Sequence, residues 1–106
     1  MSKVIEGRDD NFEQEVLASE IPVLVDFYAD WCGPCRRLAP VLETLSDKMA
    51  GKAKIVKVNV ERQADIADAY KIRSLPTIVI VKHGEVVYQH SGVLPLAELE
   101  RQLNQA

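Results

Sequence analysis

The sequence predicts one α/β domain built on a mixed β-sheet, and three observations lead to this prediction. The chain has 106 residues, which suits one domain with one core. Short apolar runs alternate with segments whose apolar residues recur at helical spacing. The last two apolar runs are separated by His83-Gly84, a two-residue connection typical of an antiparallel hairpin. We therefore expect residues 1–106 to form a single domain of order β-α-β-α-β-α-β-β-α, with about five strands flanked by about four helices.

The first half of the chain supplies two strands and two helices. Val4-Ile5 begins a short strand, and Asp9-Asp10 is expected to cap a helix over Asn11–Ala18. Pro22–Tyr28 is a nearly continuous apolar run, as in a strand covered on both faces. A long helix follows, and its inward face carries one apolar stripe: Leu38, Val41, Leu42, Leu45 and Met49.

The second half is assigned by the same two patterns, which are short apolar runs for strands and helical spacing of apolar residues for helices. The expected elements are a strand over 54–60, a short helix over 64–70 and two hairpin strands over 77–82 and 86–91. A final helix follows, with three inward leucines: Leu96, Leu99 and Leu103. Strands that alternate with helices should be parallel, whereas the last pair should be an antiparallel hairpin on the same sheet.

Composition and charge exclude several classes of function. The net charge is −3 and no basic cluster is larger than Arg36-Arg37, so neither nucleic acid nor an anionic membrane is expected as a partner. Residues 1–9 are too charged for a signal peptide, and the longest apolar runs are too short to span a bilayer. We expect a monomeric, cytoplasmic protein.

The two cysteines of the chain, Cys32 and Cys35, lie where the second strand gives way to the long helix. A Cys-x-x-Cys pair in the first helical turn brings two sulfurs within bonding distance. The first sulfur then lies beside free backbone N–H groups, which stabilise a thiolate. In a reducing compartment this spacing favours catalysis or metal binding over a structural disulfide.

Three interpretations of the pair compete. Two buried apolar cysteines are disfavoured by the Gly-Pro turn and the helix start between them. Half of a zinc site would need about two further ligands, and the candidates His83 and His90 are expected far from the cysteines. A catalytic dithiol without metal is therefore favoured, with Cys32 at the exposed tip as nucleophile and Cys35 as resolving thiol.

The neighbours of the pair fit this interpretation. Gly33 lets the backbone turn without a Cβ clash, and Pro34 suits a first helical turn, where no N–H partner is needed. Trp31 is either core filling or, as we expect at a redox tip, an aromatic at the rim of a docking surface. Asp26 interrupts an apolar strand, so burial is favoured over a solvent-facing position. Burial would raise its pKa and suit it to proton transfer near neutral pH.

Several of these segments together resemble the thioredoxin family over the full length of the chain. They are Val25–Cys35 with its Trp-Cys-Gly-Pro-Cys motif, Leu75–Thr77, Gly84 and Gly92. The resemblance implies a thioredoxin fold and a general protein disulfide reductase that works through a mixed disulfide.

The resemblance also implies roles for individual residues. Asp26 would lie behind Cys35 and help to deprotonate it, and Lys57 would modulate Asp26. Proline at a strand start is otherwise ordinary, but here a cis Leu75–Pro76 bond would face the cysteines and leave the Leu75 backbone open to a substrate. The expected docking surface comprises Trp31, Gly33, Pro34, Ile72, Leu75, Pro76, Gly92 and Val93.

The resemblance further implies that no cofactor is bound and that electrons come from NADPH through a thioredoxin reductase, the other partners being disulfide-containing client proteins. The chain departs from the family pattern at Tyr28, where many members have Trp, and at Ser74, which is often Gly. Arg36 and Glu61 stand where Lys and Asp are common. None of these changes removes a catalytic atom.

Two other functions remain open at this point. An oxidase or isomerase would use the same dithiol at a more oxidising potential, and Gly-Pro between the cysteines argues against it. A binding module would hold partners on the apolar patch, and its role would survive replacement of both Cys32 and Cys35 by serine. A reductase is the leading hypothesis.

Overall fold

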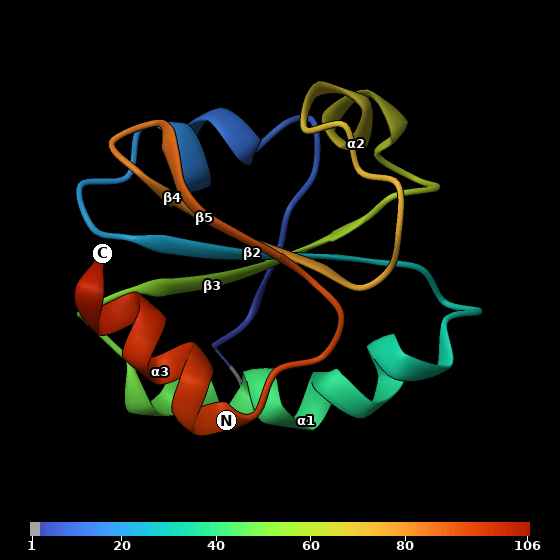
Figure 1. Cartoon of the computed structure of the whole chain (residues 1–106). Helices are drawn as coiled ribbons and strands as arrows, with labels where there is room; N and C mark the ends of the chain where they lie inside the picture. Colours follow the sequence, from blue (N-terminus) through green and yellow to red (C-terminus); the bar gives the residue numbers. More distant parts are fainter. Residues whose placement is uncertain (1–2) are drawn as a thin grey trace.

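The computed structural model describes residues 3–106 and shows a twisted five-stranded sheet between two layers of helices (Figure 1). The strands are β1 (Ile5–Glu6), β2 (Val23–Tyr28), β3 (Lys54–Asn59), β4 (Thr77–Lys82) and β5 (Glu85–Ser91). The helical segments are η1 (Glu13–Leu17), α1 (Gly33–Lys48), α2 (Ala64–Ala69) and α3 (Leu96–Gln105). The predicted order of elements is confirmed.

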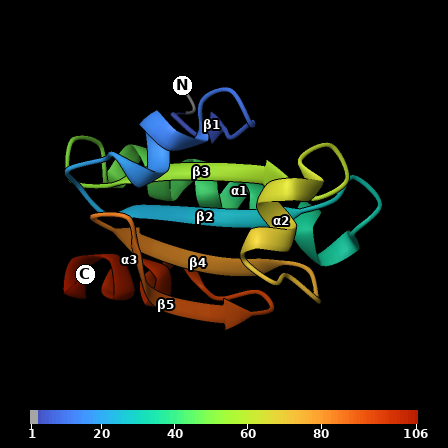
Figure 2. The same cartoon turned by 90° about the horizontal axis from the view of Figure 1, so that it is seen from above.

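The strands lie in the order β1-β3-β2-β4-β5, as the view from above shows (Figure 2). β1, β3 and β2 are parallel, whereas β4 is antiparallel to β2 and β5 is antiparallel to β4. The predicted mixed sheet is therefore confirmed. In this register Asp26 of β2 lies beside Lys57 of β3 on one side and Ile78 of β4 on the other.

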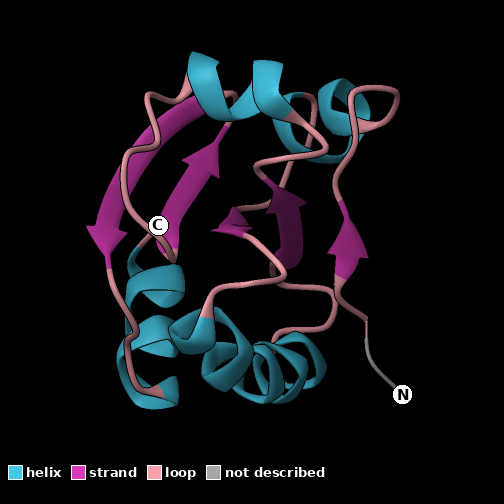
Figure 3. Ribbon diagram, turned by 90° about the vertical axis from the view of Figure 1, so that its right-hand side faces the viewer, coloured by secondary structure: helices cyan, strands magenta, loops and turns pink. Residues whose placement is uncertain are grey.

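Each face of the sheet has its own apolar core, because β2 and β4 are buried on both faces. α1 and α3 cover one face, and η1 and α2 cover the other (Figures 1 and 3). The first core includes the predicted stripe of α1 and the inward leucines of α3, packed on Leu24, Ile78 and Ile80. The second core packs Phe12, Val16 and Ile66 against the valines of β2, β3 and β4.

The hairpin between β4 and β5 has the two-residue connection that the sequence predicts. His83 and Gly84 both have positive φ, 52° and 80°, which a type I′ turn requires. Lys82 pairs with Glu85, so β5 begins one residue before the predicted Val86. A register shift at Ile80/Val81 marks a β-bulge in the ladder.

The N-terminal helical segment differs from the prediction. It is a five-residue segment of π type, in which the Ala18 amide donates to the Glu13 carbonyl at 2.8 Å. The proposed cap by Asp9-Asp10 is wrong, because Phe12 precedes the segment and no side chain caps it. The first strand also lies one residue later than predicted. Among residues 3–106, no helix combines the length and apolar character needed to cross a membrane.

Candidate active site

The two cysteines lie at the N-terminus of α1, as predicted. Cys32 is the residue before the helix, with extended backbone (φ −87°, ψ 110°), and Cys35 lies in its first turn. The two sulfurs form a disulfide, with the Cα atoms 5.3 Å apart. The backbone N–H of Cys35 donates to the Cys32 sulfur over 3.2 Å. The sulfur of Cys32 therefore occupies the capping position of the helix, where an amide donor and the helix dipole favour negative charge.

The prediction that Cys32 lies at an exposed tip is wrong for the oxidised protein. Cys32 and Cys35 are each only 4% exposed. Ala29, Tyr28, Val60 and Leu75 pack around them and cover most of both residues. Trp31 projects instead and is 65% exposed. Cys32 thus borders a surface opening beside an aromatic side chain.

That opening is a surface hollow of about 420 Å³. It brings together five of the predicted docking residues with Cys32, and its lining residues are Trp31, Cys32, Gly33, Pro34, Val60, Ile72, Arg73, Ser74 and Leu75. Leu75–Pro76 is cis, as the resemblance implied. Pro76 is buried, and its carbonyl accepts a 2.8 Å hydrogen bond from the Gly92 amide. Gly92 therefore adjoins Pro76, and the exposed Val93 follows it outside the hollow.

Gly33 was predicted to let the backbone turn without a Cβ clash, and the structure shows no such requirement. Its φ is not positive, because the described glycines with positive φ are Gly51, Gly84 and Gly92. A Cβ at Gly33 would meet only the Arg37 guanidinium, at 4.0 Å. The backbone conformation therefore does not require glycine here. The effect of Gly33 is that no side chain projects from the surface beside Cys32. Pro34 occupies the first helical turn as expected.

Asp26 is buried behind the cysteine pair, as its place in an apolar strand predicted. The residue is 3% exposed, and its Oδ1 atom has no hydrogen-bond partner within the described part of the chain. Desolvation raises the pKa of Asp26 to about 7, and the charge of Lys57 opposes this rise. The carboxyl group can therefore gain and lose a proton near neutral pH.

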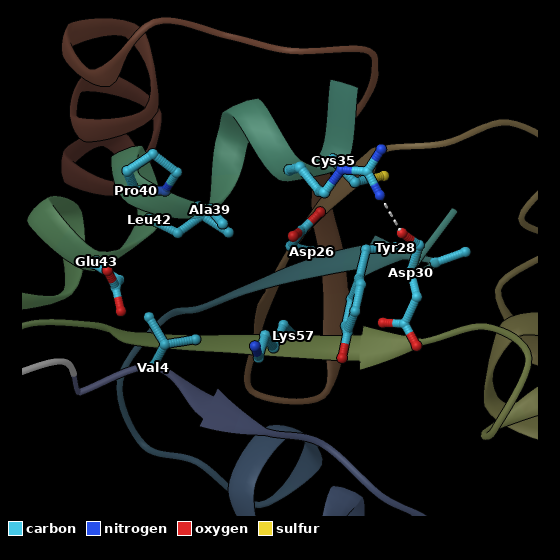
Figure 4. A pocket seen from close by; sticks show the side chains of 12 residues that line it. Val4, Asp26, Tyr28, Asp30, Cys35, Ala39, Pro40, Leu42, Glu43 and Lys57 are labelled. Atoms are coloured by element: carbon cyan, nitrogen blue, oxygen red, sulfur yellow. Dashed lines mark hydrogen bonds between the residues drawn. The ribbon is translucent and has the colours of Figure 1, made fainter. Parts of the chain in front are cut away.

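A pocket of about 390 Å³ connects this carboxyl group to the second cysteine (Figure 4). Asp26 lies at its inner end, with Cys35 at the α1 side and Lys57 on β3. The remaining lining residues are Val4, Tyr28, Ala29, Asp30, Arg36, Ala39, Pro40, Leu42 and Glu43. Cys35 and the buried Asp26 therefore line one pocket.

Lys57, which the resemblance placed beside Asp26, has two further partners in the structure. Its ammonium lies 3.7 Å from Glu6 Oε1 and 5.4 Å from the centre of the Tyr28 ring. The Tyr28 hydroxyl donates to the two Glu6 carboxylate oxygens at 3.2 and 3.0 Å. Burial and the Glu6 carboxylate raise the pKa of Tyr28 to about 12. Sequence reasoning missed Glu6 because the pairing of β1 with β3 is a tertiary feature that no local pattern reveals.

Comparisons with known proteins agree with this geometry. Residues 3–105 match the thioredoxin family model. The chain is 45% identical over 105 residues to a thioredoxin of Haemophilus influenzae, covering 99% of this chain and 98% of that protein. It is 48% identical over 102 residues to thioredoxin C-2 of Corynebacterium nephridii, covering 96% and 94% of the two chains. It is also 48% identical over 103 residues to a thioredoxin of Chlorobaculum thiosulfatiphilum, covering 97% and 95%. Similarity of this extent, in a chain that carries the dithiol in place, means that the protein belongs to the thioredoxin family and is a protein disulfide reductase with Cys32–Cys35 as its redox pair.

Proposed function

We propose that Cys32 is the nucleophile and Cys35 the resolving thiol of this reductase. The Cys32 thiolate attacks a substrate disulfide, forms a new S–S bond with one sulfur, and expels the other as a thiolate. Cys35 then attacks the Cys32 sulfur, which releases the second substrate sulfur and leaves the Cys32–Cys35 disulfide. The observation that carries this assignment is the 3.2 Å hydrogen bond from the Cys35 amide to the Cys32 sulfur, because it stabilises negative charge on Cys32 alone.

In the same mechanism Asp26 accepts the proton that Cys35 loses before its attack. The carboxyl group shares a pocket with Cys35, and its pKa of about 7 matches the task. Lys57 favours the charged carboxylate through its own positive charge. Both are proposed as parts of the catalytic machinery, Asp26 as base and Lys57 as the residue that adjusts it.

Substrate proteins are proposed to dock around the hollow beside Cys32. Trp31 and Val93 are exposed apolar side chains, and the half-buried Ile72 and Leu75 line the hollow together with Cys32. The docking surface would be completed by four residues that project little from it: Gly33, Pro34, Pro76 and Gly92. A shallow apolar surface suits a protein that reduces many clients, because it makes few demands on their shape.

The oxidised protein must be returned to the dithiol form. We propose that a thioredoxin reductase supplies two electrons from NADPH, that no cofactor is bound, and that the chain acts as a monomer. We further propose that it works in the cytoplasm, where the reducing poise would keep the pair available for reduction of clients.

Two cysteine variants test the assignment of the nucleophile and the resolving thiol. With insulin and dithiothreitol, Cys32→Ser should lose the acceleration of insulin reduction that the unsubstituted protein gives. Cys35→Ser, reduced beforehand and then freed of dithiothreitol, should instead accumulate a covalent complex with one insulin chain. The complex is visible by non-reducing electrophoresis and mass spectrometry, because no second thiol is present to resolve it. If Cys35→Ser forms no complex and Cys32→Ser does, the two roles are reversed.

A further inference from the structure

We propose that Glu6 and Tyr28 are positioning residues for Lys57, and that they limit how strongly its ammonium acts on Asp26. The proposal rests on the assignment of Asp26 as the acceptor of the Cys35 proton. It gives a role to two side chains that the dithiol chemistry does not itself require.

The contacts around the Lys57 ammonium form a closed set. Lys57 approaches Glu6 and lies over the ring of Tyr28, while the Tyr28 hydroxyl donates to the carboxylate of Glu6. Each of the three side chains therefore contacts the other two. The side chains of Lys57 and Glu6 are 42% and 38% exposed, yet a lysine with two partners has less freedom to turn elsewhere than one with none.

The register of the sheet brings the same side chains together. Glu6 pairs with Lys57 across β1 and β3, and Lys57 pairs with Asp26 across β3 and β2. Directly opposed residues have their side chains on the same face, and Tyr28 follows Asp26 by two positions on β2. All four side chains thus lie on one face, under α1, and Asp26, Tyr28 and Lys57 line one pocket (Figure 4).

The other polar groups around Asp26 do not explain how its charge is balanced. The charged or titratable groups that face it from β2, its following loop, β3 and α1 are Tyr28, Asp30, Cys35, Arg36, Glu43 and Lys57. Arg36 lines the same pocket, but its guanidinium donates to the Asp30 carbonyl at 2.7 Å. The charge that lowers the Asp26 pKa is that of Lys57. Glu43 is exposed. The neighbour of Asp26 on β4 is the apolar Ile78, so Lys57 is the cation whose position matters.

The sign of the effect follows from the charges. The Glu6 carboxylate offsets part of the Lys57 charge and holds the ammonium toward β1. Removing the carboxylate leaves Asp26 facing an uncompensated ammonium that is free to approach it. The charged form of Asp26 is then favoured, and its pKa falls.

The test is a carbon-13 titration of the Asp26 carboxyl group by NMR in the oxidised protein, where the disulfide removes both thiol titrations. In Glu6→Gln the pKa of Asp26 should fall by about half a pH unit or more, as expected for one nearby charge. Tyr28→Phe keeps the ring and removes the hydroxyl, so the pKa should fall less. The matched control is Glu15→Gln, which breaks a 3.1 Å ion pair with Lys54. Lys54 lies on β3, as Lys57 does, but this change should leave the Asp26 pKa unchanged. An unchanged Asp26 pKa in Glu6→Gln, or an equal fall in Glu15→Gln, overturns the proposal.

A double-variant cycle separates an action through Lys57 from a direct effect of the Glu6 charge. The fall caused by Glu6→Gln should shrink to less than half when Lys57→Met is also present. A fall of the same size in both backgrounds shows a purely direct effect and overturns the positioning role.

One further measurement distinguishes failure of this proposal from failure of the assigned role of Asp26. The pH dependence of resolution, followed with a preformed mixed disulfide on Cys32, should shift with the Asp26 pKa in Glu6→Gln. If the pKa moves and the profile does not, the positioning role stands and the role of Asp26 as base is wrong.

Discussion

The carboxyl group of Asp26 illustrates how burial changes the chemistry of a single side chain. The residue interrupts an apolar strand in the sequence, which predicted its burial. The structure leaves its Oδ1 atom without a hydrogen-bond partner among residues 3–106. A carboxylate in that place is costly, so the proton is retained up to a pKa of about 7.

This shift makes stability depend on pH, with a definite sign. Below about pH 4 both folded and unfolded chains carry the proton, so ionisation of Asp26 does not change the free energy of unfolding. Between pH 4 and 7 the unfolded chain loses it first, so the free energy of unfolding falls as pH rises, and the loss is complete above 7. A rise of the Asp26 pKa to about 7 corresponds to a loss of at most about 4 kcal/mol in the free energy of unfolding.

Asp26→Asn should therefore be more stable than the unsubstituted protein at pH 8 and nearly equal to it at pH 4. Urea unfolding of both oxidised proteins at pH 4, 6 and 8 measures the difference. A stability difference that is constant across this range would show that Asp26 does not titrate as a buried group.

At the same scale, residue-level reasoning had clear limits. It placed Cys35 and Asp26 correctly, because their neighbours in sequence define a helix start and a covered strand. It was wrong about the exposure of Cys32, since the covering residues Val60 and Leu75 come from distant parts of the chain. It missed Glu6 for the same reason.

At the scale of elements, the β4–β5 hairpin was predictable because its connection is local. Two residues with positive φ join the strands, and glycine adopts this conformation at little cost. The helical segment η1 was predicted less well, because Asp9-Asp10 resembles a cap that the π-type turn does not use. The spacing of apolar residues indicates reliably that a helix exists, but it does not define the residue at which the helix begins.

The turn offers a paired prediction. Gly84→Ala should lower the free energy of unfolding by about 1–2 kcal/mol, because alanine is strained at φ 80°. His83→Asn should raise it by a few tenths of a kcal/mol up to about 1, because asparagine accepts a positive φ more readily and Asn-Gly is a favoured type I′ pair. Urea unfolding at pH 7 measures both changes. Equal stabilities of the two variants would contradict the assigned turn geometry.

At the scale of the whole molecule, the sheet separates two cores, and the redox pair lies beyond the carboxyl end of its central strand, β2. β2 leads directly into Cys32, so the rigid centre of the sheet supports the helix start that holds the sulfurs. α3 contributes to one core only, through Leu99 and Leu103. Stability and redox chemistry are thus partly separable in this fold.

Leu99→Ala tests this separation. It removes a fully buried side chain from the α3 contact and should lower the free energy of unfolding by about 2–5 kcal/mol. Insulin reduction at 25 °C should stay nearly unchanged, because α3 lies away from the hollow beside Cys32. The control is Val87→Ala on the exposed edge strand, which should change stability by less than about 0.5 kcal/mol. A loss of activity while Leu99→Ala remains folded would show that the core and the site are coupled.

The sequence by itself determined the class of fold, the order of the elements, the two-residue hairpin and the dithiol with its buried carboxyl group, because each depends on periodicity, turn chemistry or spacing within a short segment. The tertiary structure alone decided the strand order, the covering of Cys32, and the contacts of Lys57 with Glu6 and Tyr28. These depend on which distant strands become neighbours, and pairing across a sheet leaves little trace in the residues that take part in it.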